Sequence, residues 1–319
     1  MKRVLITRRL PAEGLAPLQR AGFDVAMRSS DTAPGRAELL ALVEGVDALI
    51  TLMSDSVDEE LLDAAGPDLR VVANYAVGHD NIDLAACRAR DVVVTNTPDV
   101  LTDTTADLAF ALLLAVARRL REGDLMVRSG AWDGWQPGQL LGQEVSGATL
   151  GLVGMGRIGG AVARRARGFD MNVLYHNRRR SAALEAETGA RPVSLRDLLR
   201  ESDFISLHCP LTPETHHLID AAALAAMKPT AVLVNTARGP VIDEAALAAA
   251  LAAGRPWGAG LDVFEHEPAV EQRLLALPNV VLAPHIGSAT HSARTAMARL
   301  CAEAVVTVLA GGTPVNAVT

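Results

Sequence analysis

Gly154-Met155-Gly156-Arg157-Ile158-Gly159, a GxGxxG stretch, decides the fold of this chain of 319 residues. The apolar run from Leu150 to Val153 predicts a buried strand before it, and apolar residues from Ile158 to Ala166 follow at helical spacing. In this context the first glycine allows a tight turn, the second lets a pyrophosphate approach, and the third lets the helix pack on the strand. Free N–H groups at the helix N-terminus then face the phosphates. We therefore predict a dinucleotide site on a doubly wound parallel sheet.

The end of the next predicted strand, Asn172 to His176, indicates which dinucleotide binds. NAD-binding folds place an acidic residue there for the ribose hydroxyls. This chain instead has Asn177, followed by Arg178, Arg179 and Arg180. An asparagine does not repel a 2′-phosphate, and guanidinium groups can bind one through two hydrogen bonds. The pattern favours NADP(H) over NAD(H), although a short run of charges is also typical of a solvated loop, and NAD(H) stays possible.

Composition limits the classes of protein to consider. Half of the residues are hydrophobic, 3% are aromatic, and the formal net charge is −7, so we expect no nucleic-acid partner. Cys87, Cys209 and Cys301 form no CxxC pair and predict neither a disulfide framework nor a zinc cluster. The apolar run after Met1 is too short for a signal peptide, and the longest one, Leu108 to Ala117, is too short to span a membrane. We expect a cytoplasmic protein.

Strand and helix patterns alternate along the whole chain. Up to about residue 98 they predict a small α/β domain with a parallel sheet, and a second series contains the glycine motif. Between the two series we predict a long helix from Asp99 to Arg128 and a loop from Ser129 to Gly142. The loop carries Trp132 and Trp135. Large aromatic residues on a loop favour a packed anchor or a contact with a second subunit.

Polar residues follow several predicted strands of the second series. They are His208, Asn235 to Arg238, Asp262 and His285. Because ligands of open parallel sheets bind beyond the carboxyl ends of the strands, we expect these residues to meet in one crevice. Reduction of a keto acid needs a proton donor, an acid that keeps the donor charged, and a cation for the substrate carboxylate. We predict His285, Glu267 and Arg238 for these three roles.

Each of these three assignments has a plainer alternative. A lone histidine more often has a structural role than a catalytic one. Glu267 competes with Asp262 and Glu265, and an acidic residue in such a loop is often simply solvated. An arginine after a strand is typical of surface salt bridges. The joint position of Arg238, Glu267 and His285 at one sheet edge favours the catalytic interpretation.

Seven stretches, in order along nearly the whole chain, carry a resemblance to a known family. They are Asn74 to Gly78, Asn96-Thr97-Pro98 with Leu101-Thr102, Gly151 to Gly159, His208 to Thr212, Val234 to Gly239, Gly260 to Pro268, and Pro284 to Ser288. The chain resembles the D-isomer-specific 2-hydroxyacid dehydrogenases, and within them the glyoxylate/hydroxypyruvate reductases. The resemblance implies a discontinuous substrate domain of flavodoxin-like α/β fold, residues 1–98 plus 287–319. A Rossmann domain with a doubly wound parallel sheet, residues 99–286, is inserted in it.

The resemblance also implies an activity and its site. Hydride would pass from nicotinamide C4 to the 2-oxo carbon of glyoxylate, hydroxypyruvate or a related small keto acid, giving the D-2-hydroxy acid, with Arg238, Glu267 and His285 as catalytic trio. The substrate-binding residues would be Ser54, Val77, Gly78, Arg238 and Trp135. The cofactor-binding residues would be Gly154, Gly156, Arg157, Ile158, Gly159, Asn177, Arg178 and Arg179, with Thr105, Cys209, Pro210, Thr215, Thr236, Ala237, Asp262 and Gly287.

Assembly is the last feature that the resemblance implies. A homodimer would form through the cofactor domains and the long helix, with Trp135-Gln136-Pro137 reaching into the partner's active site. His79 departs from the family pattern, because many relatives carry an aromatic residue there. Formate dehydrogenases have glutamine in place of Glu267 and are disfavoured. The alternatives are reductases of 2-ketogluconate or other keto acids, phosphite dehydrogenase, and a non-enzymatic nucleotide-sensing protein similar to corepressors.

Overall fold

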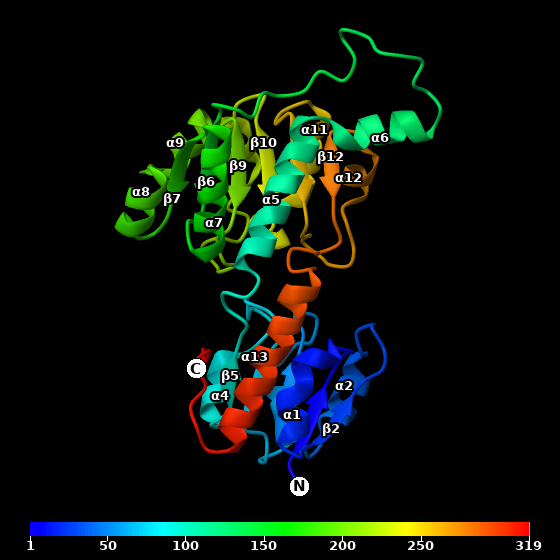
Figure 1. Cartoon of the computed structure of the whole chain (residues 1–319), viewed down its shortest axis with the longest axis vertical. Coiled ribbons are helices and arrows are strands. Elements are labelled where there is room, and N and C mark those ends of the chain that lie inside the picture. The colour runs from blue at the N-terminus through cyan, green and yellow to red at the C-terminus, as the bar shows by residue number, and fades with distance from the viewer. Residues whose placement is uncertain (319) are drawn as a thin grey trace. The chain divides into compact units, whose positions relative to one another are not determined.

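The computed structural model describes residues 1–318 of the chain (Figure 1). The chain divides into two compact units, and the first combines Met1–Leu101 with Ser288–Thr319, while the second is Thr102–Gly287. Each unit is built around a sheet whose neighbouring strands are all parallel, which confirms the predicted two-domain α/β fold class. The assignment of the units to substrate and cofactor stays a prediction.

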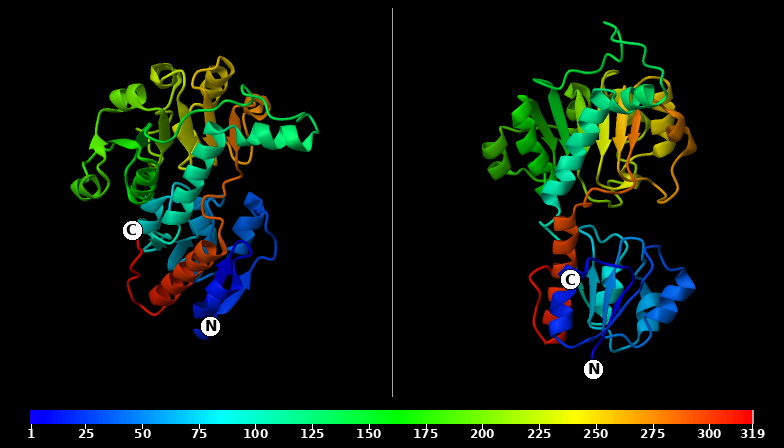
Figure 2. Two further views of the ribbon diagram at one scale, coloured as in Figure 1. Left: turned by 45° about the horizontal axis from the view of Figure 1, so that its top comes forward. Right: turned by 45° about the vertical axis from the view of Figure 1, so that its right-hand side comes forward.

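The first unit contains five strands in the order β2-β1-β3-β4-β5, which is the flavodoxin-like order. The strands are β1 (Arg3–Ile6), β2 (Asp24–Met27), β3 (Ala48–Thr51), β4 (Val71–Asn74) and β5 (Val93–Thr95). One face is covered by η1 (Ala12–Leu15), α1 (Ala16–Arg20) and α13 (His291–Leu309), and the other by α2 (Arg36–Leu42), α3 (Glu59–Ala65) and α4 (Leu84–Ala89) (Figure 2). The central strand β3 is buried along its whole length because helices cover both of its faces.

The second unit contains seven strands in the order β12-β11-β10-β9-β6-β7-β8 (Figure 1). They are β6 (Thr149–Val153), β7 (Asn172–His176), β8 (Arg191–Pro192), β9 (Phe204–Leu207), β10 (Val232–Asn235), β11 (Gly258–Leu261) and β12 (Val280–Leu282). The chain runs outward from β6 to β8 and then returns to the other side of β6. This is the doubly wound Rossmann order, and its switch point lies between β6 and β9.

Helices cover both faces of the second sheet. One face carries α5 (Thr102–Ala117) and α7 (Arg157–Ala166), and the other carries α9 (Leu195–Glu201), α10 (Ala221–Ala226) and α11 (Glu244–Ala252). The remaining helices of the unit are α6 (Leu120–Arg128), η2 (Arg167–Phe169), α8 (Ala182–Thr188), η3 (Gly239–Val241) and α12 (Gln272–Ala276). Leu150 and Leu152 of β6 point to the first core, whereas Ile205 and Leu207 of β9 point to the second. Alternate residues of the strands therefore fill two separate cores.

The predicted long helix from Asp99 to Arg128 is wrong, because the structure has two helices, α5 and α6, in its place. Arg119 lies between them with a left-handed φ of 51°. Gln143 donates its N–H to the carbonyl oxygen of Ala117 at 2.8 Å. A Cβ on Gly142 would lie 2.1 Å from the same oxygen, so only glycine lets the returning loop approach it. This contact caps the last turn of α5.

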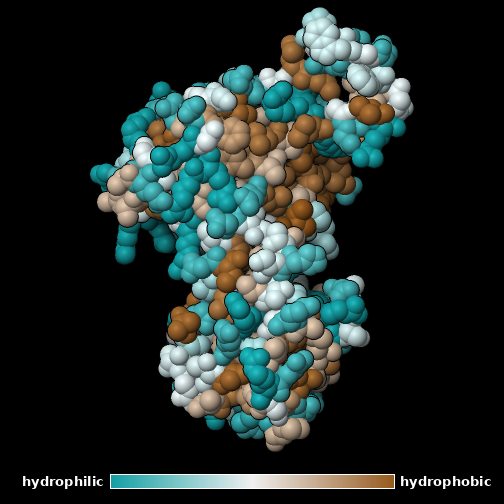
Figure 3. Space-filling model, in the orientation of Figure 1, coloured by the Kyte–Doolittle hydropathy of each residue, from teal (hydrophilic) through white to brown (hydrophobic). Residues whose placement is uncertain are grey.

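A surface with exposed apolar side chains lies on α6 and on the loop from 129 to 142. We call it the α6–loop surface and define it by Leu120, Leu125, Val127, Trp132, Trp135 and Leu141. Figure 3 shows hydrophobic residues gathered near this end of the second unit and over α5. Exposed apolar patches of this kind often mark interaction sites. Among the described residues, no helix combines the length and the apolar character that crossing a membrane requires.

Candidate active site

The glycine turn between β6 and α7 has the close contacts that the GxGxxG motif predicts. Gly154 has a φ of 95°, and a Cβ there would lie 2.6 Å from the backbone nitrogen of Cys209. A Cβ on Gly159 would lie 2.2 Å from the carbonyl oxygen of Gly154, whereas Gly156 faces open space. Within residues 1–318, no side chain caps α7, which begins at Arg157. Uncapped N–H groups beside an open glycine fit a dinucleotide pyrophosphate.

The residue after β7 is tied to this turn. The Oδ1 atom of Asn177 accepts a hydrogen bond from the backbone N–H of Met155 at 2.6 Å, and its Nδ2 donates to the Met155 carbonyl at 3.3 Å. Asn177 therefore fixes the end of β7 against the glycine turn. Arg178 and Arg179 follow it with exposed side chains. These two arginines lie where the motif places the adenosine ribose.

The third arginine of the run, Arg180, is paired with an acidic side chain of its own unit. Arg180 forms an ion pair with Glu185 at 2.6 Å, and this hydrogen bond, together with the one from the Tyr175 hydroxyl, lowers the pKa of Glu185 to about 2. Arg178 also has an acidic neighbour. The pKa of Glu214 is lowered first by a hydrogen bond from Thr212, and the charge of Arg178 contributes to the shift. The basic run is therefore not one uniform patch.

The structure brings His285 and Glu267 into direct contact. The Nδ1 atom of His285 lies 2.8 Å from Oε2 of Glu267, and Oε1 of Glu267 accepts a hydrogen bond from the Phe264 N–H at 3.0 Å. Burial acts to raise the pKa of Glu267, but the hydrogen bond and charge of His285, the Phe264 N–H and the charge of Arg238 outweigh it and hold the pKa below its usual range. Glu267 is therefore an ionised partner for the imidazole.

Asp262, at the end of β11, holds the backbone around His285. Its Oδ1 and Oδ2 atoms accept hydrogen bonds from the N–H groups of Ile286 at 2.7 Å and Gly287 at 2.8 Å. Its carbonyl oxygen accepts the His285 N–H at 2.8 Å. His285 has a left-handed φ of 54°, a conformation that costs a non-glycine residue about 1 kcal/mol. Three bonds to one residue hold it there, and burial raises the pKa of Asp262.

Arg238 lies on the neighbouring loop, three residues after the end of β10 at Asn235. The Nδ2 atom of Asn235 donates to the carbonyl oxygen of Arg238 at 2.9 Å, and Nη1 of Arg238 donates to the Ala237 carbonyl at 2.8 Å. Gly239 then passes so close to the next loop that a Cβ would lie 1.8 Å from the carbonyl carbon of Phe264. The chain thus brings the loops after β10, β11 and β12 together, and Arg238 acts electrostatically on Glu267.

Several predicted cofactor residues lie in the same unit. The Thr105 hydroxyl donates to the Gly287 carbonyl at 3.1 Å, and the Thr215 hydroxyl donates to the Pro210 carbonyl at 2.7 Å. Burial raises the pKa of the Cys209 thiol to about 11, so it is not a reactive thiolate. Among the described residues, the buried hydroxyl oxygen of Thr236 has no hydrogen-bond partner. A buried hydroxyl of this kind fits contact with a polar ligand.

His208, which also follows a strand, differs from His285. Its Nε2 atom lies 2.9 Å from the hydroxyl oxygen of Ser206. Burial lowers the pKa of His208 to about 4, so it is neutral at neutral pH. It is therefore a poor candidate for a proton donor.

The predicted substrate residues of the first unit lie after β3 and β4. The side-chain amides of Asn96 and Asn74 donate to the carbonyl oxygens of Val77 at 2.8 Å and Gly78 at 2.7 Å. Because a trans peptide points its C=O and N–H in opposite directions, the N–H of Gly78 points away from Asn96. The Ser54 hydroxyl accepts a hydrogen bond from Arg8 at 2.6 Å. Among the residues described, Nδ1 of the neighbouring His79 is buried without a partner.

Sequence reasoning missed the buried ion pair that supports Ser54. Arg8 and Asp55 are 4% and 2% exposed, and their Nη2 and Oδ1 atoms lie 2.8 Å apart. Asp55 also accepts hydrogen bonds from the hydroxyl groups of Thr7 and Thr51. The available signal was the position of Arg8 and Asp55 just after two neighbouring strands. Trp135, by contrast, is 81% exposed in this single chain.

Comparisons with known proteins identify a family and several relatives that this chain is similar to. The family model described as D-isomer specific 2-hydroxyacid dehydrogenase, NAD binding domain, matches residues 110–287. A glyoxylate reductase of Thermococcus litoralis is 52% identical over 99% of this chain and 96% of its own length. A solved protein of Thermus thermophilus is 49% identical, with a TM-score of 0.94 over 99% of this chain and 100% of that one. The NADPH-dependent glyoxylate/hydroxypyruvate reductase of Sinorhizobium meliloti, solved with NADP and malonate, is 35% identical, with a TM-score of 0.87 over 100% and 97%.

Proposed function

The chain belongs to the D-isomer-specific 2-hydroxyacid dehydrogenase family, and we propose that it reduces glyoxylate, hydroxypyruvate or a related small 2-keto acid with NADPH. The observation that carries the proposal is the contact between His285 and the ionised Glu267, with Arg238 acting on the same carboxylate. This trio lies in the unit that contains the glycine turn. The likeness to glyoxylate reductases supports the substrate class.

Each residue of the trio has its own proposed role in the reaction. When bound, a reduced nicotinamide supplies the hydride that the 2-oxo carbon receives. His285 donates a proton from Nε2 to the carbonyl oxygen, because its Nδ1 is held by Glu267. The negative charge of Glu267 stabilises the imidazolium before transfer. One hydride and one proton convert the 2-oxo acid to the 2-hydroxy acid, which has the D configuration wherever the product carbon is chiral, as it is in the product from hydroxypyruvate but not in glycolate.

Arg238 is the proposed cation for the substrate carboxylate. A guanidinium group binds a carboxylate through two parallel hydrogen bonds and so fixes the direction of the adjacent carbonyl group. The loop contacts of Asn235 and Gly239 support this role by fixing the backbone that carries Arg238. We propose that the first unit also contacts the substrate, through the Gly78 N–H, Val77 and the Ser54 hydroxyl.

The preference for NADPH rests on the end of β7. Asn177 leaves that position without a carboxylate, and Arg178 and Arg179 are exposed beside it. The engagement of Arg180 by Glu185 limits the proposed 2′-phosphate contacts to the first two arginines. The similar reductase of Sinorhizobium meliloti, solved with NADP, supports this choice. Use of NADH as a weaker cofactor is compatible with the same loop.

We also propose that two chains form a homodimer through the α6–loop surface. Its apolar side chains include Val127 and Trp135, which are 60% and 81% exposed in the single chain. Burial of such side chains against a partner is favourable by roughly 25 cal/mol per Å². Trp135 is the proposed contact with the partner's substrate.

A panel of keto acids with each cofactor tests the proposed activity. NADPH oxidation is followed by near-ultraviolet absorbance with glyoxylate, hydroxypyruvate and 2-ketogluconate, and the same series is repeated with NADH. We expect turnover of glyoxylate and hydroxypyruvate. At low cofactor concentration, this turnover should be faster with NADPH than with NADH. If only 2-ketogluconate is turned over, the protein is a reductase of that larger keto acid. If phosphite reduces NADP+ or NAD+ in its presence, the protein is a phosphite dehydrogenase. Cofactor binding without any turnover would favour a nucleotide sensor.

A further inference from the structure

Two histidines and a glutamate outside the proposed catalytic trio lie close together on the second unit. His216 and His217 belong to the segment between β9 and α10, and Glu265 to the segment after β11. The nitrogen and oxygen atoms that could bind a metal all lie within 4.8 Å of one another. We call these three residues the His–His–Glu cluster.

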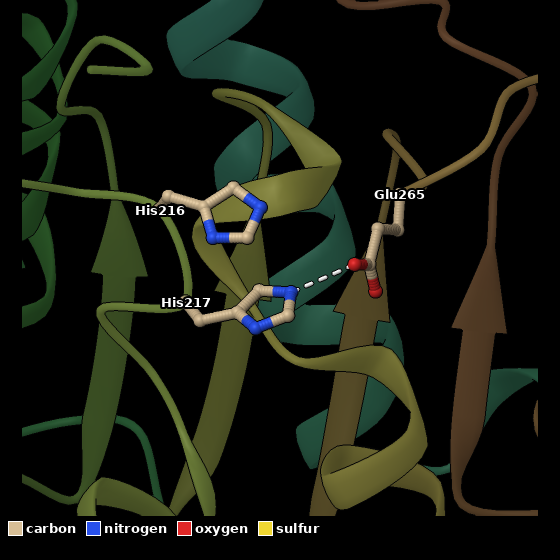
Figure 4. Close-up of side chains that lie close together, drawn as sticks. All are labelled: His216, His217 and Glu265. Atoms are coloured by element: carbon tan, nitrogen blue, oxygen red, sulfur yellow. Dashed lines mark hydrogen bonds and ion pairs between the residues drawn. The ribbon is translucent and has the colours of Figure 1, made fainter. Parts of the chain in front are cut away.

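The two imidazole rings are stacked on the same side of their segment. Their centroids lie 4.1 Å apart with an interplanar angle of 27°. His217 has a left-handed φ of 50°, which turns the chain between the two side chains. Figure 4 shows both rings facing the carboxylate of Glu265, and Nε2 of His217 lies 2.7 Å from its Oε1 atom. The His216 side chain is exposed, so the cluster is open to solvent.

Backbone contacts hold two members of the cluster in place. The N–H of His217 donates to the Pro240 carbonyl at 2.8 Å. The Oε2 atom of Glu265 accepts the N–H of Glu244 at 3.3 Å, and the N–H of Glu265 donates to the Glu244 carboxylate. These contacts orient Glu265 as outer-shell hydrogen bonds orient the ligands of metal sites.

The surroundings of the cluster favour a cation. Glu244 is buried, and its carboxylate accepts a hydrogen bond from the N–H of Glu265, so a second carboxylate lies next to the cluster. A dication beside Glu265 would offset the repulsion between the two carboxylates. Metal bonds of about 2.0–2.2 Å to imidazole and carboxylate require closer ligand atoms than the present spread. Because His217 and Glu265 are already in contact, binding requires the exposed His216 side chain to move closer to them.

We propose that His216, His217 and Glu265 bind one divalent transition-metal ion of the zinc class, with water at the remaining coordination positions. Imidazole ligands select ions such as Zn²⁺ and Ni²⁺, whereas Mg²⁺ and Ca²⁺ prefer sites built from oxygen alone. The ion would join the segment after β9 to the segment after β11, and these segments also carry Thr215 and Glu267. This site is separate from the proposed reduction, which uses no metal.

Metal binding by the full chain, without an affinity tag and after dialysis against a chelator, tests the proposal. Zn²⁺ is titrated in competition with a chromophoric chelator, and Ni²⁺ is titrated in parallel. We expect one saturable site per chain, unaffected by excess Mg²⁺. His216→Ala should weaken binding more than about tenfold. His217→Asn should do the same, because asparagine tolerates the left-handed backbone.

His291→Ala is the matched control, because it also removes one exposed histidine but lies at the start of α13. Its Zn²⁺ affinity should equal that of the wild type. A second readout is the unfolding temperature, which Zn²⁺ should raise in the wild type and in His291→Ala but not in His216→Ala. The proposal is overturned if no saturable site is found, or if His216→Ala binds Zn²⁺ as the wild type does. Should His217→Asn fail to fold, His216→Ala decides alone.

Discussion

His285 Nδ1 lies 2.8 Å from Oε2 of Glu267, and the two residues come from segments that follow different strands of the same sheet. The second oxygen of Glu267 is held by the Phe264 N–H. The carboxylate therefore cannot turn away from the ring without losing a backbone hydrogen bond. Because Glu267 takes up Nδ1, the proton for a substrate would come from Nε2.

Removal of the imidazole should stop the chemical step. We expect His285→Gln to lower kcat for keto-acid reduction by about 10²- to 10⁴-fold, which is the usual contribution of a positioned acid. NADPH affinity, measured by its fluorescence on binding, should stay unchanged. His291→Gln, which changes an exposed histidine of α13, is the control and should keep wild-type kcat. A His285→Gln enzyme with near wild-type turnover would remove His285 from its proposed role.

The charge of Glu267 should shape the pH dependence of the reaction. Glu267→Gln keeps a side chain of the same shape but removes the negative charge beside the imidazole. The protonated ring then lacks its ionic partner, so reduction in the variant should slow at a lower pH than in the wild type. The wild-type pKa of Glu267 is held below 4.5. The stability that its pairing contributes is therefore present above pH 4.5 and is lost as the pH falls through its lowered pKa.

Two measurements check these expectations for Glu267. The pH profile of kcat should shift to lower pH in Glu267→Gln, and the difference in unfolding temperature between wild type and variant should shrink below pH 4.5. Superimposable pH profiles would show that the carboxylate has no part in proton donation.

Cofactor choice should depend on the first two arginines of the run after β7. Exchange of Arg178 and Arg179 for serine removes the proposed bonds to the 2′-phosphate, and each such charged bond contributes about 1.5–3 kcal/mol. We expect KM for NADPH to rise about 10- to 100-fold, with little change in KM for NADH. Arg180→Ser is the control, because Arg180 is paired with Glu185 and should affect both cofactors alike. Equal changes with NADPH and NADH in the double variant would support the solvated-loop interpretation.

Much of this architecture could be predicted because its signals are local. Each signal depends only on residues that are neighbours in the sequence. These signals are the run from Leu150 to Val153, the three motif glycines and the apolar spacing after Ile158, and the structure confirms the strand, turn and helix there. The break between α5 and α6 has a remote cause, because Gly142 and Gln143 return to cap Ala117. No pattern near residue 118 marks that contact.

The candidate site also has a part that the sequence indicated and a part that it did not. The residue types at the strand ends indicated His285 and Glu267, and the contact between them follows from the parallel sheet. The support given by Arg8 to Ser54 and by Asp262 to the His285 backbone depends on distances across loops, which spacing along the chain does not encode. The pairing of Arg180 with Glu185 depends on the directions of two side chains, which the sequence pattern does not indicate either.

Asp262 should be as important for stability as for the reaction. Asp262→Ala leaves the N–H groups of Ile286 and Gly287 without their acceptors. The bond to Gly287 is buried, and an unsatisfied buried group costs about 1–3 kcal/mol. We expect a lower free energy of unfolding in urea and a lower kcat, because the left-handed backbone at His285 loses its support. Asp243→Ala, which removes one helix cap of α11, is a control for loss of a capping acid. Asp262→Ala with unchanged stability and kcat would contradict the role of Asp262 in holding the backbone around His285.

Charge placed on the α6–loop surface should separate the two chains of the proposed dimer. Val127 is 60% exposed in the single chain, so Val127→Glu should leave the fold of each chain intact. At a dimer interface the same glutamate would be buried without a partner, which costs several kcal/mol. We expect the wild type to sediment as a dimer and Val127→Glu at the mass of one chain, 33.5 kDa. Val315→Glu, at a fully exposed valine of the other unit, should remain a dimer. A wild type that sediments as a single chain, or a Val127→Glu variant that stays dimeric, would place the interface elsewhere and leave Trp135 without its proposed role.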